Sequence, residues 1–156
     1  MIEKGIISLL LGNTVLTDPN RQTAQASLLA KLGSNAIFPE GIPEGTAWPV
    51  GVVHRTGGDH VKTLGGLAGF GTFRVAVDFY CTTYSDARLL VHYALGVLGG
   101  YRGRAGPYGN PPVGFFVQGM FPSDNPDEYV PPAHAEEFGI EAAGMEFDVW
   151  ANEMTS

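Results

Sequence analysis

The strand predicted between Thr72 and Thr82 is the feature that most constrains the fold, because its side chains alternate in character. Successive side chains of a strand point to opposite faces of a sheet, so one face is predicted to be apolar and the other mixed. The pattern predicts a half-buried sheet with a helix layer on its apolar face. It puts Asp78 on the mixed face, where replacement by serine is expected to be mild. The apolar set is Phe73, Val75, Val77, Phe79 and Cys81, and the mixed set is Arg74, Ala76, Asp78, Tyr80 and Thr82.

A helix is predicted directly after this strand. The hydroxyl of Ser85 is expected to accept a hydrogen bond from an amide of the first turn, and Asp86 suits the positive end of the helix dipole. The pair Gly99-Gly100 supplies the stop. The apolar stripe of this helix consists of Leu89, Leu90, Tyr93, Ala94, Val97 and Leu98.

The first half of the chain is predicted to begin with a helix from Met1 to Leu11, where apolar residues recur at helical spacing. A long connection from Val15 to Trp48 follows, and it has room for an additional short helix over Arg21–Leu32. Val50–Arg55 is predicted as a short strand. Val61–Gly71 is predicted as a glycine-rich loop that carries apolar side chains.

Two strands are predicted in the second half. Arg102–Pro112 is expected to be a glycine- and proline-rich loop, and Val113–Phe121 a strand that is apolar on both faces and therefore covered on both sides. Glu137–Trp150 is predicted as a long last strand. Its apolar residues change phase, and one extra residue restores the register, so a β-bulge is expected near Ala143-Gly144. In the Val113–Phe121 strand, one face is expected to hold Val113, Phe115, Val117 and Phe121, and the other Phe116 and Met120.

The predicted order is therefore helix, strand, strand, helix, strand, strand (αββαββ). The expected fold is α+β, a single domain over residues 1–156, with an approximately four-stranded mixed or antiparallel sheet and helices packed on one face. A length of 156 residues fits one domain.

The charge of the chain argues against several classes of function. Its net charge is −7 and its nine basic residues are scattered, whereas nucleic-acid binding needs clustered Lys and Arg. An acidic surface does suit a channel through which DNA slides without sticking. The apolar run Ile6–Leu11 is far shorter than the ~20 residues that span a membrane, and the residues after it do not fit a signal peptide.

The sequence offers no pattern for catalysis or for a cofactor. His54 and His60 lie close enough in sequence to share a metal, but they lack a ligand spacing, so ordinary surface histidines are the better interpretation. Cys81 is predicted to be a buried, inert thiol. The glycines of 66–71 do not form a phosphate-binding motif, and no Lys-Ser/Thr follows them. A cluster of acidic residues lacks the spacing of a calcium loop: Asp124, Asp127 and Glu128. We therefore predict no catalytic residue, no cofactor and no bound metal.

Two apolar segments instead predict contacts with a partner. The Val61–Gly71 loop and the Val113–Phe121 strand carry more apolar side chains than a lone subunit should leave in water. The predicted interface residues are Leu64, Leu67, Phe70, Phe116 and Met120.

Four segments, in their order and spacing, resemble a known family. They are a short helix at the start, the alternating strand that leads into the predicted helix and its glycine-rich end, an acidic-aromatic triplet, and the end of the last strand. The starting helix reads Met1-Ile2-Glu3-Lys4-Gly5-Ile6. The alternating strand reads Phe73-Arg74-Val75-Ala76-Val77-Asp78-Phe79-Tyr80, it leads into Thr83-Tyr84-Ser85-Asp86-Ala87-Arg88, and the helix ends in Leu98-Gly99-Gly100-Tyr101-Arg102-Gly103. The triplet is Asp127-Glu128-Tyr129, and the last strand ends in Met145-Glu146-Phe147-Asp148-Val149-Trp150. On these residues the chain resembles the phage tail-completion proteins, which include the siphophage tail terminators. The likeness covers Val50–Trp150 and the first helix, whereas the Val15–Trp48 segment and the Arg102–Pro112 loop are longer than the family pattern.

The resemblance implies a structural virion protein without catalytic activity. It implies a six-membered ring at the head-proximal end of the tail tube, in the neck of a virion whose parts are made in the cytoplasm of the host bacterium. Its partners would be further copies of itself, the tail tube protein and a head-completion or connector protein. DNA would pass through the lumen without specific binding, and no membrane would be involved.

Two other functions stay open from the sequence. One is a different ring protein of the same assembly, such as a head-completion or a tail-tube protein, although a tail-tube subunit is expected to contain more β-structure than this sequence predicts. The other is a small-molecule-binding α+β module, which needs a pocket with a few convergent polar groups. A small hydrolase would need an activated nucleophile, and the sequence shows none.

Overall fold

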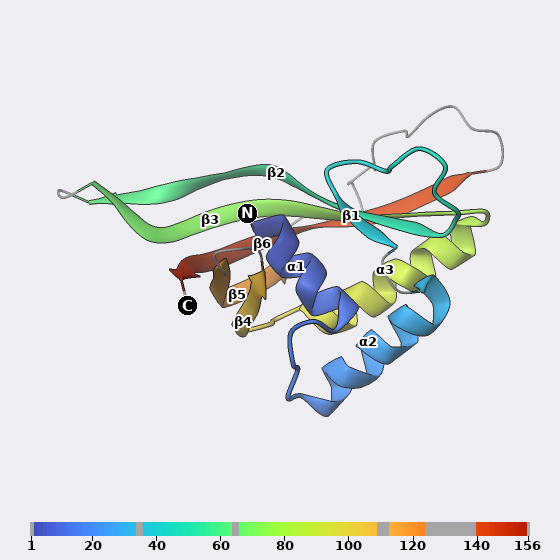
Figure 1. The fold of residues 1–156 in the computed structure, drawn as a ribbon, viewed down its shortest axis with the longest axis horizontal. Helices are drawn as coiled ribbons and strands as arrows, with labels where there is room; N and C mark the ends of the chain where they lie inside the picture. The colour runs from blue at the N-terminus through green and yellow to red at the C-terminus, as the bar shows by residue number, and fades with distance from the viewer. Residues whose placement is uncertain (1, 34–35, 64–65, 109–112, 124–139, 156) are drawn as a thin grey trace.

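The computed structural model describes residues 2–33, 36–63, 66–108, 113–123 and 140–155. They form one six-stranded sheet in the order β1-β2-β3-β6-β5-β4, with the three helices of the described residues on one face (Figure 1). β1 pairs with β2 in parallel, and all other neighbours are antiparallel. The elements are α1 (Ile2–Leu11), α2 (Pro19–Leu32), β1 (Ile37–Pro39), β2 (Val50–Thr63), β3 (Gly66–Cys81), α3 (Tyr84–Leu98), β4 (Gly103–Tyr108), β5 (Val113–Pro122) and β6 (Glu141–Thr155).

The predicted four-stranded sheet in αββαββ order is therefore wrong. The sequence pattern missed both edge strands, β1 and β4. β1 is only three residues long and lies inside the Val15–Trp48 connection. β4 lies in the predicted Arg102–Pro112 loop, and its sequence GRAGPY has low strand propensity. Pairing with β5 holds β4 extended in spite of that propensity.

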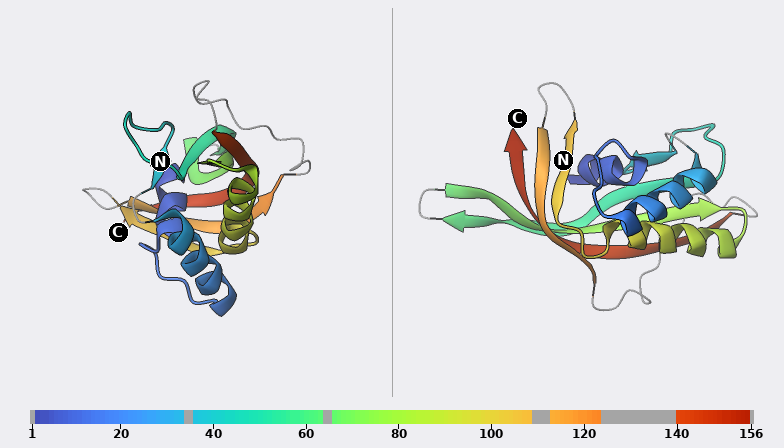
Figure 2. Two further views of the ribbon diagram at one scale, coloured as in Figure 1. Left: turned by 90° about the vertical axis from the view of Figure 1, so that its right-hand side faces the viewer. Right: turned by 90° about the horizontal axis from the view of Figure 1, so that it is seen from below.

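The segment predicted as a loop over Val61–Gly71 is also different. β2 and β3 form a long hairpin whose register runs from Val50 opposite Tyr80 to Thr63 opposite Gly66. The end of this hairpin, around Thr63 and Gly66, projects well beyond the three helices (Figure 2). We call this two-stranded end the arm. No helix covers the arm, so its sequence does not need the apolar alternation by which a buried strand is recognised.

The core lies between the helices and one face of the sheet. The odd-numbered residues of β3 and β6 point to the helices, and Val75, Phe79, Phe147 and Val149 are all buried there. The three helices supply the opposite wall, through Ile6, Leu9, Leu10, Leu28, Leu90, Val97 and Leu98, each of which is fully buried.

The register of β6 overturns the predicted β-bulge at Ala143-Gly144. β6 pairs with β3 without interruption from Glu141 opposite Cys81 to Asn152 opposite Phe70. The apparent change of phase arose because the sequence interpretation began the strand at Glu137, whereas β6 begins at Glu141.

The N-terminus of α3 is capped by Thr83, and not by Ser85 as predicted. The amide of Asp86 donates to Oγ1 of Thr83 over 3.3 Å, so the helix begins one residue before Ser85. At the other end, the amide of Gly99 donates to the carbonyl of Leu95 over 2.8 Å, as expected for a glycine stop.

Gly51 generates the first testable prediction. A Cβ at this position would lie 2.9 Å from Cε1 of Phe79 and 3.1 Å from Cγ1 of Ile37, both of which are buried. We expect Gly51→Ala to lower the free energy of unfolding by about 1–3 kcal/mol, because overpacking forces buried neighbours to shift. Urea unfolding followed by circular dichroism measures the change. Gly41→Ala is the matched control, because nothing lies within 4 Å of its added Cβ, and equal midpoints for the two variants would contradict the packing described for β2.

Candidate interaction surfaces

The groups that the sequence offered for chemistry do not form a reactive site. Among the described residues, no cluster of three or more His, Cys, Asp or Glu side chains could hold a metal ion. Cys81 is buried, and burial raises the pKa of its thiol to about 11, so it stays protonated at neutral pH. The side chain of His60, and the acidic residues from Asp124 to Glu128, lie outside the part of the chain that is described.

His54 forms an ion pair instead of a metal site. Its Nε2 lies 2.8 Å from Oδ2 of Asp78, which is fully buried on the sheet face opposite the helices, called here the outer face. The hydrogen bond that His54 donates to the carboxylate of Asp78 raises the pKa of His54, and partial burial opposes this rise. The aspartate is buried and contacts His54 of the neighbouring strand, which argues against the expectation that Asp78→Ser would be mild.

The outer face has one covered part and one exposed part. The covered part surrounds Asp78 and includes Val50, Val52, Ala76 and Tyr80, all of which are buried. The ring of Trp48 lies 6.4 Å from that of Tyr80 and covers part of this surface. The sheet is thus packed on both sides near the start of β2, and a single alternating pattern could not reveal that.

The exposed part of the outer face carries two large aromatic side chains. Phe121 on β5 is 54% exposed and Trp150 on β6 is 47% exposed. The prediction that Phe121 shares the core face with Val117 is wrong, because the register of β5 shifts between Val117 and Gly119. After this bulge Met120 enters the core and Phe121 turns outward.

Gly119 brings the two aromatics together. It pairs with Trp150 across the β5–β6 ladder, and a Cβ on Gly119 would lie 2.7 Å from Cε2 of Phe121. The ring of Phe121 therefore lies over the glycine and next to the strand position of Trp150. We call this surface, made by Phe121 and Trp150, the aromatic platform.

A groove of about 500 Å³ borders the aromatic platform. Arg74 and Asp148 form an ion pair of 3.2 Å on its floor, and both side chains are about half exposed. The groove is lined by Thr56, Gly57, Gly58, Thr72, Phe73, Arg74, Asp148 and Trp150.

The five predicted interface residues fall in different places. Leu64 lies outside the described residues. Leu67 lies in the β3 half of the arm, and Phe70 lies where β3 also pairs with Asn152 of β6; for both, only the backbone is described. Phe116 is half-buried and pairs with Asn152 of β6. Met120 is fully buried within the subunit, so the structure assigns it to the core and not to an exposed surface.

Sequence reasoning missed the aromatic platform, although one signal for it is present. A glycine inside an apolar strand often marks a β-bulge, and Gly119 does so here. Counting the bulge would have reversed the faces of Met120 and Phe121. Trp150 occupies an even-numbered position of β6, so an uninterrupted register for that strand would have placed it on the outer face.

Comparisons with known proteins give a likeness of fold only. No protein-family profile and no curated protein matches the sequence. Among solved structures, the chain is similar to one chain of the "Virion of native gene transfer agent (GTA) particle", with a TM-score of 0.53 and 13% sequence identity. The match covers 85% of this chain and 89% of that one, so the two share most of their architecture.

None of the helices in the described ranges is both long and apolar enough to cross a bilayer.

The His54–Asp78 pair predicts a dependence of stability on pH. A histidine whose pKa is raised on folding contributes stability that is complete below its unfolded pKa of about 6.5 and is lost as the pH rises through its folded pKa. We therefore expect the stability difference between the parent chain and His54→Gln to be largest near about pH 5 and to shrink towards about pH 8. Urea unfolding at a series of pH values measures this difference. The control His92→Gln removes an exposed histidine of α3. If its stability difference from the parent changed with pH as that of His54→Gln does, the effect could not be assigned to the His54–Asp78 pair.

Proposed function

We propose that this protein is a structural subunit of a phage-like virion. The observation that carries the proposal is the fold shared, over 85% of the chain, with a chain of the gene transfer agent virion particle. The resemblance of the sequence to tail-completion proteins supports the same assignment. In the finer form of the proposal, six copies form a ring at the head-proximal end of the tail tube, where the ring ends tube polymerisation and joins the tail to the head.

A closed ring needs two different surfaces on each subunit, because its interface is heterologous. The aromatic platform and the arm are our candidates for these surfaces. The platform exposes Phe121 and Trp150 on the outer face of the sheet, and large exposed aromatics are typical of protein interfaces. The arm projects beyond the helices, as a segment that reaches a neighbour would; it carries Leu67 in β3, and Phe70 lies next to it where β3 pairs with β6.

The acidic balance of the chain suits the passage of DNA through such a ring. With a net charge of −7, carboxylates that face the lumen would repel phosphates and keep the passage free of specific contacts. Candidates for this role are Glu40, Glu44, Asp59, Asp124, Asp127 and Glu128. In this proposal the partners are further copies of the chain, the tail tube protein and a head-side connector.

The aromatic platform predicts how assembly fails. We expect the double variant Phe121→Ser/Trp150→Ser to fold as the parent does but to lose self-association, because both side chains are already exposed in the subunit. Sedimentation analysis measures the oligomer and circular dichroism the fold. The matched control is Tyr84→Ser/Leu89→Ser, which removes two exposed apolar side chains of α3 on the opposite side of the sheet. Unchanged oligomers in the platform variant, or equal loss in the control, would remove the platform from the interface.

The assembly role predicts a defined phenotype. Deleting the gene from the virus that encodes it should give filled or fillable heads without tails, together with tail tubes of uncontrolled length. Electron microscopy of the lysate shows both. Tails of normal length that fail to attach would instead indicate a head-side connector of the neck, and intact infectious particles would refute the structural function altogether.

A further inference from the structure

A groove on the helix side of the molecule, away from the aromatic platform, has the charge of a binding site. It encloses about 420 Å³ between the connection from α1 to α2 and the turn from α3 to β4. One wall is 15–18 with Arg21, and the other is 100–104. The groove thus joins segments that are at least 79 residues apart in the sequence.

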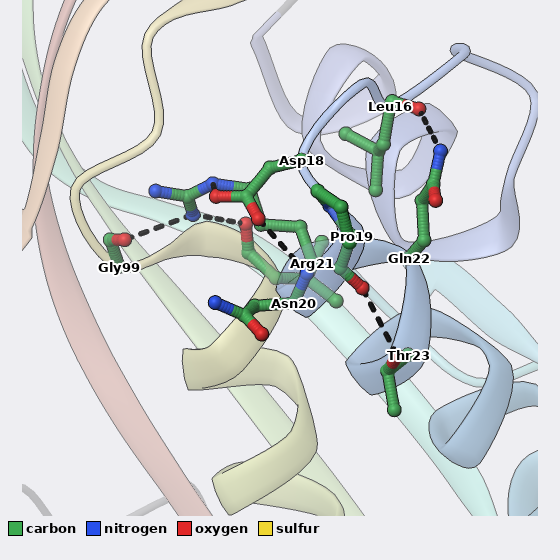
Figure 3. Close-up of polar contacts among 9 residues, drawn as sticks. Leu16, Asp18, Pro19, Asn20, Arg21, Gln22, Thr23 and Gly99 are labelled. Carbon is green, nitrogen blue, oxygen red and sulfur yellow. Dashed lines mark hydrogen bonds and ion pairs between the residues drawn. The ribbon is translucent and has the colours of Figure 1, made fainter.

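Arg21 makes the base of this groove rigid. Its Nη1 donates to the carbonyls of Val97 and Gly99 over 2.7 and 2.9 Å, at the C-terminal end of α3, where a cation is favoured (Figure 3). Its Nε lies 3.6 Å from Oδ2 of Asp18, and its guanidinium lies over the ring of Tyr101 at 5.7 Å. The charge of Arg21 is therefore engaged within the subunit, and its main role is to fasten the two walls together.

Val15 is an exposed apolar side chain at the rim, fixed there by its neighbours. Thr14 is buried, with its Oγ1 2.6 Å from Oγ of Ser8 and accepting the amide of Gly106 over 3.0 Å. Leu16, the residue that follows Val15, is buried in the core. Because both neighbours point inward, the extended chain turns Val15 outward, and it is 86% exposed.

Arg102 and Arg104 leave the groove with unbalanced positive charge. Both are exposed, and within the described ranges neither forms an ion pair. Three arginines thus line a groove that contains one carboxylate, Asp18, in a chain whose net charge is −7. Among the described residues, no carboxylate pairs with Arg102 or Arg104, so their charge is available to an external anion.

We propose that this groove binds an acidic, extended segment of a different protein, with carboxylates on Arg102 and Arg104 and an aliphatic side chain against Val15. Guanidinium groups bind carboxylates through paired hydrogen bonds, and the exposed valine adds an apolar contact that a phosphate backbone would not use. The net acidity of the chain also opposes DNA. A second copy of the chain is the alternative occupant, and the self-association measurement below distinguishes it. This proposal does not depend on the ring.

The test uses the full chain and a fluorescein-labelled synthetic peptide in which glutamates and aspartates flank a central leucine. We expect saturable binding by fluorescence anisotropy, and a loss of affinity of at least roughly tenfold in Arg102→Glu/Arg104→Glu, because the reversed charges repel the peptide. Val15→Ser should also weaken binding while leaving the fold intact. The control Lys4→Glu/Arg88→Glu makes the same change of net charge at exposed positions outside the groove and should bind like the parent.

Each other result would overturn the proposal. Failure of the parent chain to bind the peptide, or equal losses in the two charge-reversal variants, would show that the groove does not select acidic segments. Tighter binding of a double-stranded DNA oligonucleotide that depends on Arg102 and Arg104 would assign the groove to nucleic acid. Loss of self-association in Arg102→Glu/Arg104→Glu, measured by sedimentation, would make a second copy the occupant.

Discussion

The packing of β3 and β6 against α3 is the contact on which the rest of the molecule depends. These two strands pair without a register shift over twelve positions, and they give one continuous apolar face to the helices. Phe79 and Phe147 on the sheet and Leu90 on the helix are fully or almost fully buried there. Since this register sets the face of every β6 side chain, it also fixes which residues point away from the helices. The aromatic platform is therefore a consequence of the same pairing that builds the core.

The two faces of the sheet differ: one packs against the helices, and the outer face has a covered part and an exposed part. Near the start of β2 it is covered and holds a buried carboxylate, Asp78, with its histidine partner. Towards the end of β6 it is open and aromatic. Removing one partner of a buried ion pair is destabilising, because it leaves the other charge buried and uncompensated. We interpret the covered half as the part that holds β2 in register, so that the arm beyond it keeps a fixed direction.

Sequence reasoning succeeded where periodicity was strong and failed where pairing decided the structure. The β3 strand and the α3 helix were predictable because each buries a regular stripe. β4 was not, since glycine and proline give it no strand signal, and β5 supplies the pairing that makes it a strand. Phe121 was placed on the wrong face because one bulge reverses all residues after it. The groove between 15–18 and 100–104 had no signal in the sequence, because its two walls meet only in the folded chain.

The contact between Thr14 and Gly106 has a consequence for how the subunit is made. The two residues are 92 positions apart, yet one hydrogen bond of 3.0 Å joins them, and α1 packs against β4. On the ribosome α1 emerges before all the strands, and the strand that it contacts most, β4, follows only after β1, β2 and β3. Contacts of such long sequence separation form slowly. The packing of α1, through Ile6 and Leu9, is therefore complete only after β4 has been synthesised.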